Sequence, residues 1–229
     1  MNLTEDGILL IDKPVGWTSF DVVAKIRGMR RAALKAEGIT PTKRQLRVGH
    51  AGTLDPFATG LLVILLGEAT KRSDEFLKQD KTYEAVVTLG ATSTTGDPEG
   101  ELANVSDTVP TDEAVQAVMG TFTGTITQIP PAYSAIKING QRAYKLARKG
   151  HEVEMPSRQV VIHSLELISY DYPELHIRTH VSSGTYIRSL AEDIGKTLGT
   201  GAYCSQLRRT TIGEQRIADA TEMSVLAID

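Results

Sequence analysis

Gly49-His-Ala-Gly-Thr-Leu-Asp-Pro-Phe-Ala-Thr-Gly60 is the stretch around which the rest of the chain is organised. Its glycines and Pro56 surround one carboxylate, Asp55, and one imidazole, His50. Glycine lets backbone approach a ligand closely, and a proline restricts the preceding residue to extended or turn conformations. The pattern places Asp55 at the edge of a loop, where it either caps a turn or does chemistry. The apolar run Leu61–Leu66 follows at once and predicts a buried strand.

Length and composition indicate an ordinary globular protein. The chain has 229 residues, of which 41% are hydrophobic and 23% charged, enough for a single domain with one sizeable core. Its one cysteine, Cys204, excludes an internal disulfide and fits a reducing compartment. We find neither a signal-peptide pattern nor an apolar segment long enough to span a membrane, so we expect a cytoplasmic protein.

The net charge is only −3, but basic and acidic residues are concentrated in separate parts of the chain. From Lys25 to Arg47 there are eight Lys or Arg residues against one acid, and from Lys137 to Lys149 five against none. Between Thr82 and Ile136 there are seven acids and neither Lys nor Arg. The basic blocks either form a surface that faces a polyanion such as a nucleic acid or are ordinary solvated faces. The acids would point away from such a partner.

The hydrophobic periodicity predicts a mixed, largely antiparallel α+β layout. Gly7–Asp12 reads as a strand, and Thr18 with Asp21 forms a capping box for the helix that follows. Tyr83–Leu89 alternates as a half-buried strand, and further strands and helices follow up to a short terminal helix over Thr221–Ile228. His176 and His180 share one face of a strand, but no third ligand is spaced to join them, which argues against a metal site.

Tyrosines interleave with cations in the region from Ile129 to Gly150. Tyr133 and Tyr144 lie among Lys137, Arg142 and Lys145. Aromatic rings that stack on bases and cations that pair with phosphate are typical of RNA-binding surfaces, although both tyrosines would equally fit a packing role.

Several motifs, in order along nearly the whole chain, resemble those of the TruB-type tRNA pseudouridine synthases. They are Gly7–Pro14 with Gly16 and Thr18-Ser19, Gly49–Pro56, Lys81-Thr-Tyr-Glu-Ala85, Pro131-Ala-Tyr-Ser-Ala-Ile-Lys137, Ser183-Gly-Thr-Tyr-Ile-Arg188 and Leu207-Arg-Arg209. The resemblance implies the pseudouridine-synthase fold, a curved, mainly antiparallel mixed sheet flanked by helices and loops. It also implies isomerisation of uridine to pseudouridine at position 55 in the TΨC arm of tRNA, by an enzyme that needs no cofactor and no metal.

The resemblance assigns roles to particular residues. Asp55 matches the family's essential aspartate, and Arg188 matches the arginine that pairs with it. Tyr83 matches the tyrosine that packs on the target base, and His50 the residue that fills the space the flipped base leaves. Tyr186 and Leu207 match residues that line the pocket, and Lys13 supports the active-site loop. Lys137, in the Pro131–Lys137 motif, is expected to bind RNA.

The resemblance also bears on domain organisation. It implies one catalytic domain over 1–229, with an RNA-gripping, thumb-like insertion at about 124–158 and without the PUA-type domain that usually follows. The segment at about 28–45 is longer than usual and strongly basic. We therefore predict that Arg30, Arg31, Lys35, Lys43 and Arg44 supply phosphate contacts that a C-terminal domain provides elsewhere.

Three readings of the function compete. The first is a monomeric enzyme that acts on tRNA without a guide RNA or protein partner. The second, a tRNA-binding chaperone with no catalytic role, would share every basic and aromatic feature. Binding alone does not require the combination of Asp55, Arg188 and Tyr83, which favours the enzyme. The third, a carboxylate-dependent glycosidase, normally uses two paired carboxylates, and no second acid accompanies Asp55 in its motif.

Overall fold

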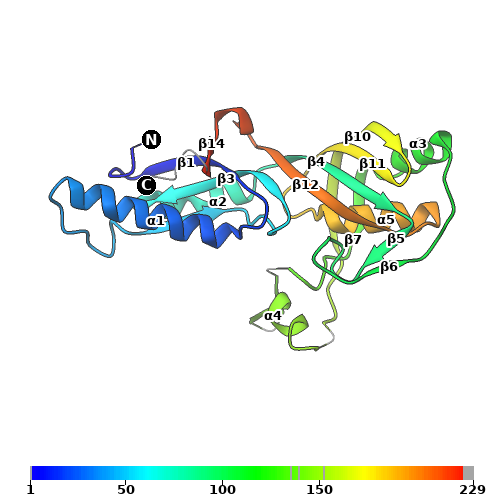
Figure 1. The fold of residues 1–229 in the computed structure, drawn as a ribbon, viewed down its shortest axis with the longest axis horizontal. Coiled ribbons are helices and arrows are strands. Elements are labelled where there is room, and N and C mark those ends of the chain that lie inside the picture. Colours follow the sequence, from blue (N-terminus) through cyan, green and yellow to red (C-terminus); the bar gives the residue numbers. More distant parts are fainter. Residues whose placement is uncertain (1, 135, 139, 152, 224–229) are drawn as a thin grey trace. The chain divides into compact units, whose positions relative to one another are not determined.

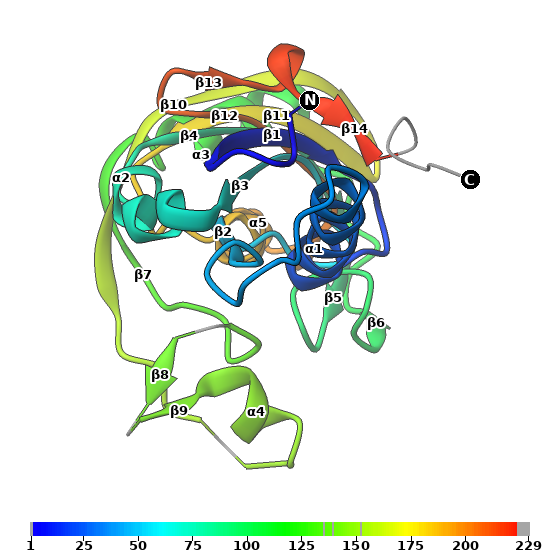
Figure 2. The same ribbon diagram turned by 90° about the vertical axis from the view of Figure 1, so that its left-hand side faces the viewer.

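The computed structural model describes residues 2–134, 136–138, 140–151 and 153–223. The chain divides into two compact units (Figures 1 and 2). Unit 1 comprises Met1–Tyr83 and Arg208–Asp229, and unit 2 comprises Glu84–Leu207. Two long strands, β4 (Lys81–Leu89) and β12 (Ala202–Ile212), contribute residues to both units.

The sheet of unit 1 is built on β3 (Thr59–Leu66), whose residues from Gly60 onward are all buried. β1 (Gly7–Lys13) pairs with β3 in antiparallel fashion from Gly7↔Leu66 to Lys13↔Gly60. On the other edge of β3 lie β2 (Val48–Ala51), also antiparallel, and the end of β12, which is parallel through Arg208↔Thr59. The predicted buried strand over 61–66 is confirmed.

The helices of unit 1 begin where the sequence indicates. α1 (Ser19–Ala36) is capped by Thr18, and the predicted box with Asp21 is present. α1 buries an apolar face made by Val22, Val23, Ile26 and Leu34. A 3₁₀ helix, η1 (Gly67–Arg72), follows β3 and leads into the short α2 (Ser73–Leu77), whose Phe76 joins the core around Leu61 and Val63.

Unit 2 contains the strand order β12-β4-β11-β10-β7. β10 (Arg158–Asp171) pairs antiparallel with β11 (Glu174–Val181) and with β7 (Gly124–Gln128). The buried face expected for β4 is confirmed, because Tyr83, Ala85, Val87 and Leu89 are all buried, but Val86 on the other face is buried as well. α3 (Asp112–Gly120) contacts both β10 and α5 (Ile187–Leu198).

Unit 2 also contains two small hairpins. β5 (Ala91–Ser93) pairs with β6 (Leu102–Asn104), and β8 (Lys137–Ile138) pairs with β9 (Gln141–Arg142). The second hairpin and α4 (Ala143–Ala147) project beyond the ends of β7 and β10 (Figure 2). They lie within the predicted thumb-like segment at 124–158, whereas β7 and Arg158 at its ends belong to the sheet.

The prediction of a terminal helix over 221–228 was wrong at its first two residues. Thr221 and Glu222 are not helical but form β14 (Thr221–Glu222), parallel to β1, after β13 (Gln215–Arg216) and the 3₁₀ turn η2 (Ile217–Asp219). The rest of the expected helix, from residue 224, lies outside the described residues. A partner strand thus outweighed the local helical pattern, as tertiary context often does. Among the described residues, no helix is both long and apolar enough to cross a membrane.

Candidate active site

Asp55 lies in the loop between β2 and β3 and is half-buried. Its backbone carbonyl accepts a hydrogen bond from the Ala58 amide at 3.1 Å, which closes a tight turn around Pro56. Leu54 and Ala58 on either side are 4% and 0% exposed and anchor the turn in the core. The loop is therefore fixed at its two apolar ends while the carboxylate between them keeps partial access to solvent.

The first residue of α1, together with the segment before it, holds this loop. Ser19 contacts the residue before Asp55. Ser19 is 2% exposed, and its hydroxyl donates to the Leu54 carbonyl at 3.1 Å. The same oxygen accepts from the Leu54 amide at 2.9 Å. Since the Leu54 carbonyl belongs to the peptide bond that joins Leu54 to Asp55, this pair of bonds restrains the backbone directly beside the carboxylate.

The same segment also holds the residue after Asp55. The Pro56 carbonyl accepts from the Gly16 amide at 2.8 Å and from the Lys13 ammonium at 3.4 Å. Lys13 is fully buried, and its Nζ also donates to the carbonyls of Pro14, at 2.9 Å, and Trp17, at 2.6 Å. A buried ammonium surrounded by carbonyls is a tie between loops, which agrees with the supporting role that the resemblance implies for Lys13.

Arg209 fixes the two strands that flank the Asp55 loop. It is 1% exposed, and its guanidinium donates to the carbonyls of Gly52 and Leu61, each at 2.8 Å. Gly60 has φ +100°, and a Cβ there would lie 2.3 Å from the Arg209 carbonyl oxygen, so only glycine fits. Arg209 belongs to the Leu207-Arg-Arg209 motif, but its structural role could not be predicted from the sequence.

His50 and Tyr83 belong to the same unit as Asp55. His50 lies on β2 and is half-buried, and Tyr83 lies on β4 and is 7% exposed. The other predicted site residues, Lys137, Tyr186, Arg188 and Leu207, belong to unit 2. The pairing of Arg188 with Asp55 and the shared pocket thus remain predictions of the resemblance.

Tyr186 and Arg188 stand at the start of α5. The Tyr186 backbone exchanges two hydrogen bonds with the fully buried Gln128 amide: its N–H donates to Oε1 at 2.8 Å, and its carbonyl accepts from Nε2 at 2.9 Å. The Arg158 guanidinium lies over the Tyr186 ring, 4.8 Å from its centroid. Leu207 is 8% exposed, and Lys137, on the β8–β9 hairpin, is exposed.

Arg188 is a buried cation, 3% exposed, with a polar shell inside unit 2. Nη1 pairs with the carboxylate of Asp97 at 3.0 Å and donates to the Thr95 carbonyl at 2.9 Å. Nη2 donates to the Tyr133 carbonyl at 2.8 Å. Asp97 itself is 3% exposed, so the expectation that the acids between Thr82 and Ile136 form a surface that points away from a polyanion was wrong for this residue. Its Gly96-Asp97-Pro98 context looks like a solvent turn, and nothing in the local sequence announces a buried partner.

A second acid faces the same cation. Burial raises the pKa of the Glu192 carboxyl, while the positive charge of Arg188 acts in the opposite direction. A Cβ on Gly96 would come within 2.6 Å of Glu192 Oε1 and 3.4 Å of Arg188 Cβ, which shows how tightly the Asp97 turn packs on α5. The position of the Arg188 guanidinium is thus determined by carboxylates and carbonyls together.

Within the part of the chain that the structure describes, no three His, Cys, Asp or Glu side chains lie close enough to share a metal ion. His176 bonds Glu174 at 3.2 Å, and the ring of His180 faces that of His163 at a centroid distance of 4.8 Å. The prediction that the reaction needs no metal is not tested by this observation.

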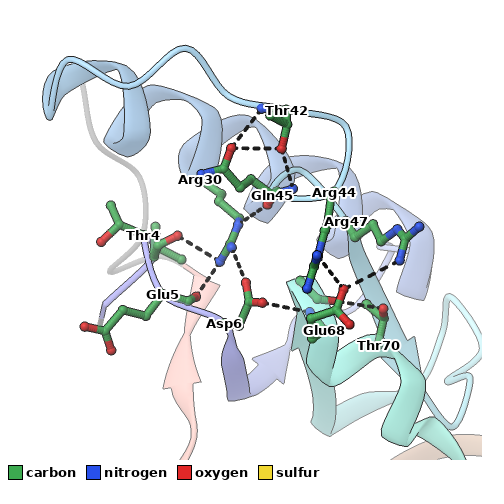
Figure 3. A network of polar contacts seen from close by, with 12 residues as sticks. Thr4, Glu5, Asp6, Arg30, Thr42, Arg44, Gln45, Arg47, Glu68 and Thr70 are labelled. Atoms are coloured by element: carbon green, nitrogen blue, oxygen red, sulfur yellow. Dashed lines mark hydrogen bonds and ion pairs between the residues drawn. The ribbon is translucent and has the colours of Figure 1, made fainter.

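The basic segment at 28–45 has two parts. α1 runs through it as far as Ala36, and a loop follows. Arg30 is fully buried, and its guanidinium pairs with Asp6 at 2.7 Å and donates to the carbonyls of Leu3, Glu5 and Gln45 (Figure 3). The prediction that Arg30 contacts phosphate was therefore wrong, because a side chain without solvent access cannot reach a ligand.

Arg44, at the end of this segment, shares one acid with Arg47 and Lys71. Arg44 pairs with Glu68 at 2.8 Å, Arg47 lies 3.8 Å from the same oxygen, and Lys71 pairs with its second oxygen. The Glu68 amide in turn donates to Asp6 at 2.9 Å (Figure 3). The Lys71 contact is the first of the causes that lower the pKa of the Glu68 carboxyl. These exposed cations are therefore partly neutralised within the chain.

The family model described as TruB family pseudouridylate synthase, N-terminal domain, matches residues 39–187. The model described as the tRNA pseudouridylate synthase B C-terminal domain matches residues 188–228.

Proteins named tRNA pseudouridine synthase B are similar over nearly the whole chain. That of Parabacteroides distasonis is 47% identical over 239 residues, covering 100% of this chain and 99% of the relative. That of Bacteroides fragilis strain YCH46 is 44% identical and covers 99% and 95%. That of Burkholderia mallei strain NCTC 10247 is 43% identical over 96% of this chain but 69% of the longer relative.

Among solved structures, a chain of a Cbf5-Nop10-Gar1 complex is similar, with a TM-score of 0.67 and 29% identity. A chain of an H/ACA RNP bound to a substrate RNA containing 2'-deoxyuridine gives 0.63 and 28%. This chain is covered to 97% in both cases but spans only about half of those chains, 53% and 52%. The predicted α+β pseudouridine-synthase fold is confirmed. By both family models and by its full-length relatives, the chain belongs to the TruB family of pseudouridylate synthases.

Proposed function

We propose that this protein isomerises uridine to pseudouridine at position 55 in the TΨC loop of tRNA. The observation that carries the proposal is the held loop of Asp55, in a chain that is 47% identical over its full length to a tRNA pseudouridine synthase B. Backbone ties before and after Asp55 fix its main chain, while its carboxylate stays half-buried. Such a pre-positioned carboxylate is what covalent or general-base assistance requires.

The reaction exchanges one glycosidic bond for another. The bond from the ribose C1′ to N1 of uracil breaks, the base turns, and a bond from C1′ to C5 forms, with the C5 proton finally lost and N1 protonated. Asp55 assists this exchange by attacking either the base or the sugar. Because the target base lies inside a folded loop, it must first be flipped out, at a cost of a few kcal/mol.

The remaining roles in the proposed site follow the resemblance. Tyr83 packs on the flipped base, and His50 fills the space it leaves. Arg188 holds the carboxylate of Asp55 ionised, as an opposite charge nearby does. Tyr186 and Leu207 line the pocket, and Lys137 contacts RNA from the projecting segment within 124–158. In this proposal no cofactor or metal takes part.

We further propose that the enzyme acts in the cytoplasm on free tRNA, as a monomer that needs neither a guide RNA nor a protein partner. The full-length similarity to proteins named for tRNA supports this view. The similar solved chain of the Cbf5-Nop10-Gar1 complex has Nop10 and Gar1 as its partners.

The test is incubation of the purified protein with an unmodified tRNA transcript, followed by mapping of pseudouridine along the RNA. The proposal expects near-complete conversion of uridine 55 and conversion at no other uridine. Tight tRNA binding with no pseudouridine at any position would instead favour a tRNA chaperone.

A further inference from the structure

α1 presents two faces of different chemistry. Val22, Val23, Ile26, Arg30 and Leu34 are buried against the rest of unit 1. On the opposite side the residues are exposed. Phe20 and Asp21 occupy its first turn, and the residues that follow are either cations or very small. The part from Ala24 onward, called the exposed face below, consists of Ala24, Lys25, Gly28, Arg31, Ala32 and Lys35.

The cations of this face differ from several others of unit 1. Arg44, Arg47 and Lys71 gather on Glu68, and Arg30 is buried with Asp6. Among the described residues, by contrast, none forms an ion pair or a hydrogen bond with the side chains of Lys25, Arg31 or Lys35. The one acid in the first turn of α1, Asp21, is held by Thr18. The face therefore carries positive charge that no described residue neutralises.

Gly28 has no internal explanation. It lies in the middle of an 18-residue helix, where glycine destabilises by roughly 0.5–1 kcal/mol relative to alanine. A Cβ at this position would meet nothing within 4 Å, and φ is not positive, so neither packing nor backbone conformation requires glycine. An external ligand that approaches the helix backbone would require it, since any side chain there would hold that ligand away.

The face leads away from the loop of Asp55. α1 begins at Ser19, whose hydroxyl is bonded to Leu54 beside Asp55. At 1.5 Å per residue, Lys25, Arg31 and Lys35 lie roughly 9, 18 and 24 Å along the axis from Ser19. When one nucleotide of an RNA substrate is bound at Asp55, other parts of the RNA can lie along the roughly 24 Å of α1 between Ser19 and Lys35.

We propose that the exposed face of α1 docks the phosphate backbone of a double-stranded arm of the substrate tRNA, with Lys25, Arg31 and Lys35 each pairing with a phosphate and Gly28 marking the closest approach. The proposal rests on the proposed function and adds where the RNA outside the modified loop is bound. Ammonium and guanidinium groups bind phosphate by charge and by hydrogen bonds, and they read no sequence.

The test compares two triple variants that remove the same charge from the same unit. One is Lys25→Gln/Arg31→Gln/Lys35→Gln on the α1 face, and the matched control is Arg44→Gln/Arg47→Gln/Lys71→Gln around Glu68. Both are made in an Asp55→Asn background, so that binding of unmodified tRNA transcript is measured without turnover. Affinity is titrated against salt concentration.

Each phosphate contact contributes about 0.7–0.9 to the slope of log affinity against log salt. The α1-face variant should therefore lose about 2–3 from that slope and bind on the order of 10²-fold more weakly at 0.1 M salt. The control variant should lose less than about 1. A slope equal to that of the parent in the α1-face variant, or an equal loss in both variants, would overturn the docking surface and leave only a general effect of charge.

Gly28→Gln tests the close approach. Glutamine is a good helix former, so the variant should be at least as stable as the parent, yet its tRNA affinity should fall by at least tenfold. Ala36→Gln, an exposed change in the last turn of α1, serves as the control and should bind like the parent. Parent-like binding by Gly28→Gln would overturn the approach of RNA to this part of the helix.

The outcomes separate this inference from the proposed function. Pseudouridine formation by the wild-type protein is measured in parallel on the same transcript. Its absence would overturn the function while the salt slopes still report on the surface. Full conversion together with unchanged slopes would overturn the surface alone.

Discussion

The hydroxyl of Ser19 and the backbone of Leu54 form a reciprocal pair of hydrogen bonds, donor to carbonyl at 3.1 Å and amide to hydroxyl at 2.9 Å. One buried side chain at the start of α1 thereby satisfies both polar groups of the residue that precedes Asp55. Ser19 belongs to the N-terminal motif and Leu54, 35 positions further along the chain, to the Gly49–Pro56 motif. This contact explains how the N-terminal motif supports the Asp55 loop. It is a positioning contact, because Ser19 acts through the backbone of Leu54.

Ser19→Ala should slow the chemical step more than it weakens substrate binding. Loss of both bonds frees the peptide beside Asp55, and a displacement of about 1 Å can cost on the order of 10²-fold in rate. We expect the single-turnover rate at saturating tRNA to fall by about 10- to 100-fold, with tRNA affinity within about threefold of the wild type.

Thr179→Val is the matched control for Ser19→Ala. It removes a fully buried hydroxyl that donates to the Ser164 carbonyl at 2.9 Å in unit 2. Both variants should lose about 1–3 kcal/mol of unfolding free energy, but only Ser19→Ala should lose rate. Equal rates in the two variants would show that Ser19 contributes stability alone.

Arg188 and Asp97 should be coupled in stability. Removing Asp97 takes from the buried guanidinium charge of Arg188 the carboxylate with which it forms an ion pair of 3.0 Å, so Asp97→Leu should cost up to about 3–5 kcal/mol of unfolding free energy. Arg188→Met in the same background removes that charge, and the double variant should be less destabilised than the sum of the single variants by at least about 1 kcal/mol. Urea denaturation of the four proteins gives the coupling, and strict additivity would contradict the buried pair.

Arg30 and Arg31 are sequence neighbours with opposite expected effects. Arg30 is fully buried against Asp6 and three carbonyls, so Arg30→Met should lower the unfolding free energy by about 3–5 kcal/mol. Arg31 is exposed, and Arg31→Met should change stability by less than about 0.5 kcal/mol. Only Arg31→Met should reduce the salt dependence of tRNA binding. A stable Arg30→Met variant with a reduced salt slope would reverse this assignment.

Lys81 should make stability rise with pH in the alkaline range. Burial, helped by the nearby charge of Arg209, lowers the pKa of its ammonium from 10.5 to about 8. Below about pH 8 both states are protonated and the cost of burial is fully present. Between the two pKa values the unfolded chain binds more protons, so the unfolding free energy of the wild type rises by up to about 3 kcal/mol.

Lys81→Met provides the reference for this pH dependence. The difference in unfolding free energy, wild type minus variant, should increase when urea denaturation is repeated from about pH 7 to about pH 10. The variant also loses the bonds that Lys81 donates to the carbonyls of Leu77 and Gln79, but that loss alone has no such dependence on pH. A constant difference over this range would contradict the lowered pKa of Lys81.

Much of the fold follows from local patterns in the sequence. The capping box of Thr18 and Asp21, the uninterrupted apolar run of β3 and the alternation of β4 each belong to one element and depend on its own residues. Family motifs then place Asp55 in its loop. These features could be predicted because burial of an apolar face and satisfaction of a helix end are local requirements.

Which charged side chains are buried and which are exposed could not be predicted in this way. Arg30 and Arg31 look alike in the sequence, yet one helical step separates a buried anchor from an exposed cation. Asp97 lies in a Gly- and Thr-rich segment that reads as surface, yet it is buried by the distant Arg188. Such pairings join residues far apart in the chain, so only the folded arrangement reveals them.

The central claim, that Asp55 drives pseudouridine formation in tRNA, is tested most directly by one comparison. Wild-type protein and Asp55→Asn are incubated with the same unmodified tRNA transcript, and pseudouridine at position 55 is quantified over time, with tRNA affinity and unfolding free energy measured alongside. The account predicts conversion by the wild type and none by Asp55→Asn, because the amide keeps the shape but cannot act as nucleophile or base. It also predicts nearly equal affinity and stability for the two proteins. Turnover by Asp55→Asn within about tenfold of the wild type, a difference of only about 1.4 kcal/mol in barrier, would contradict it.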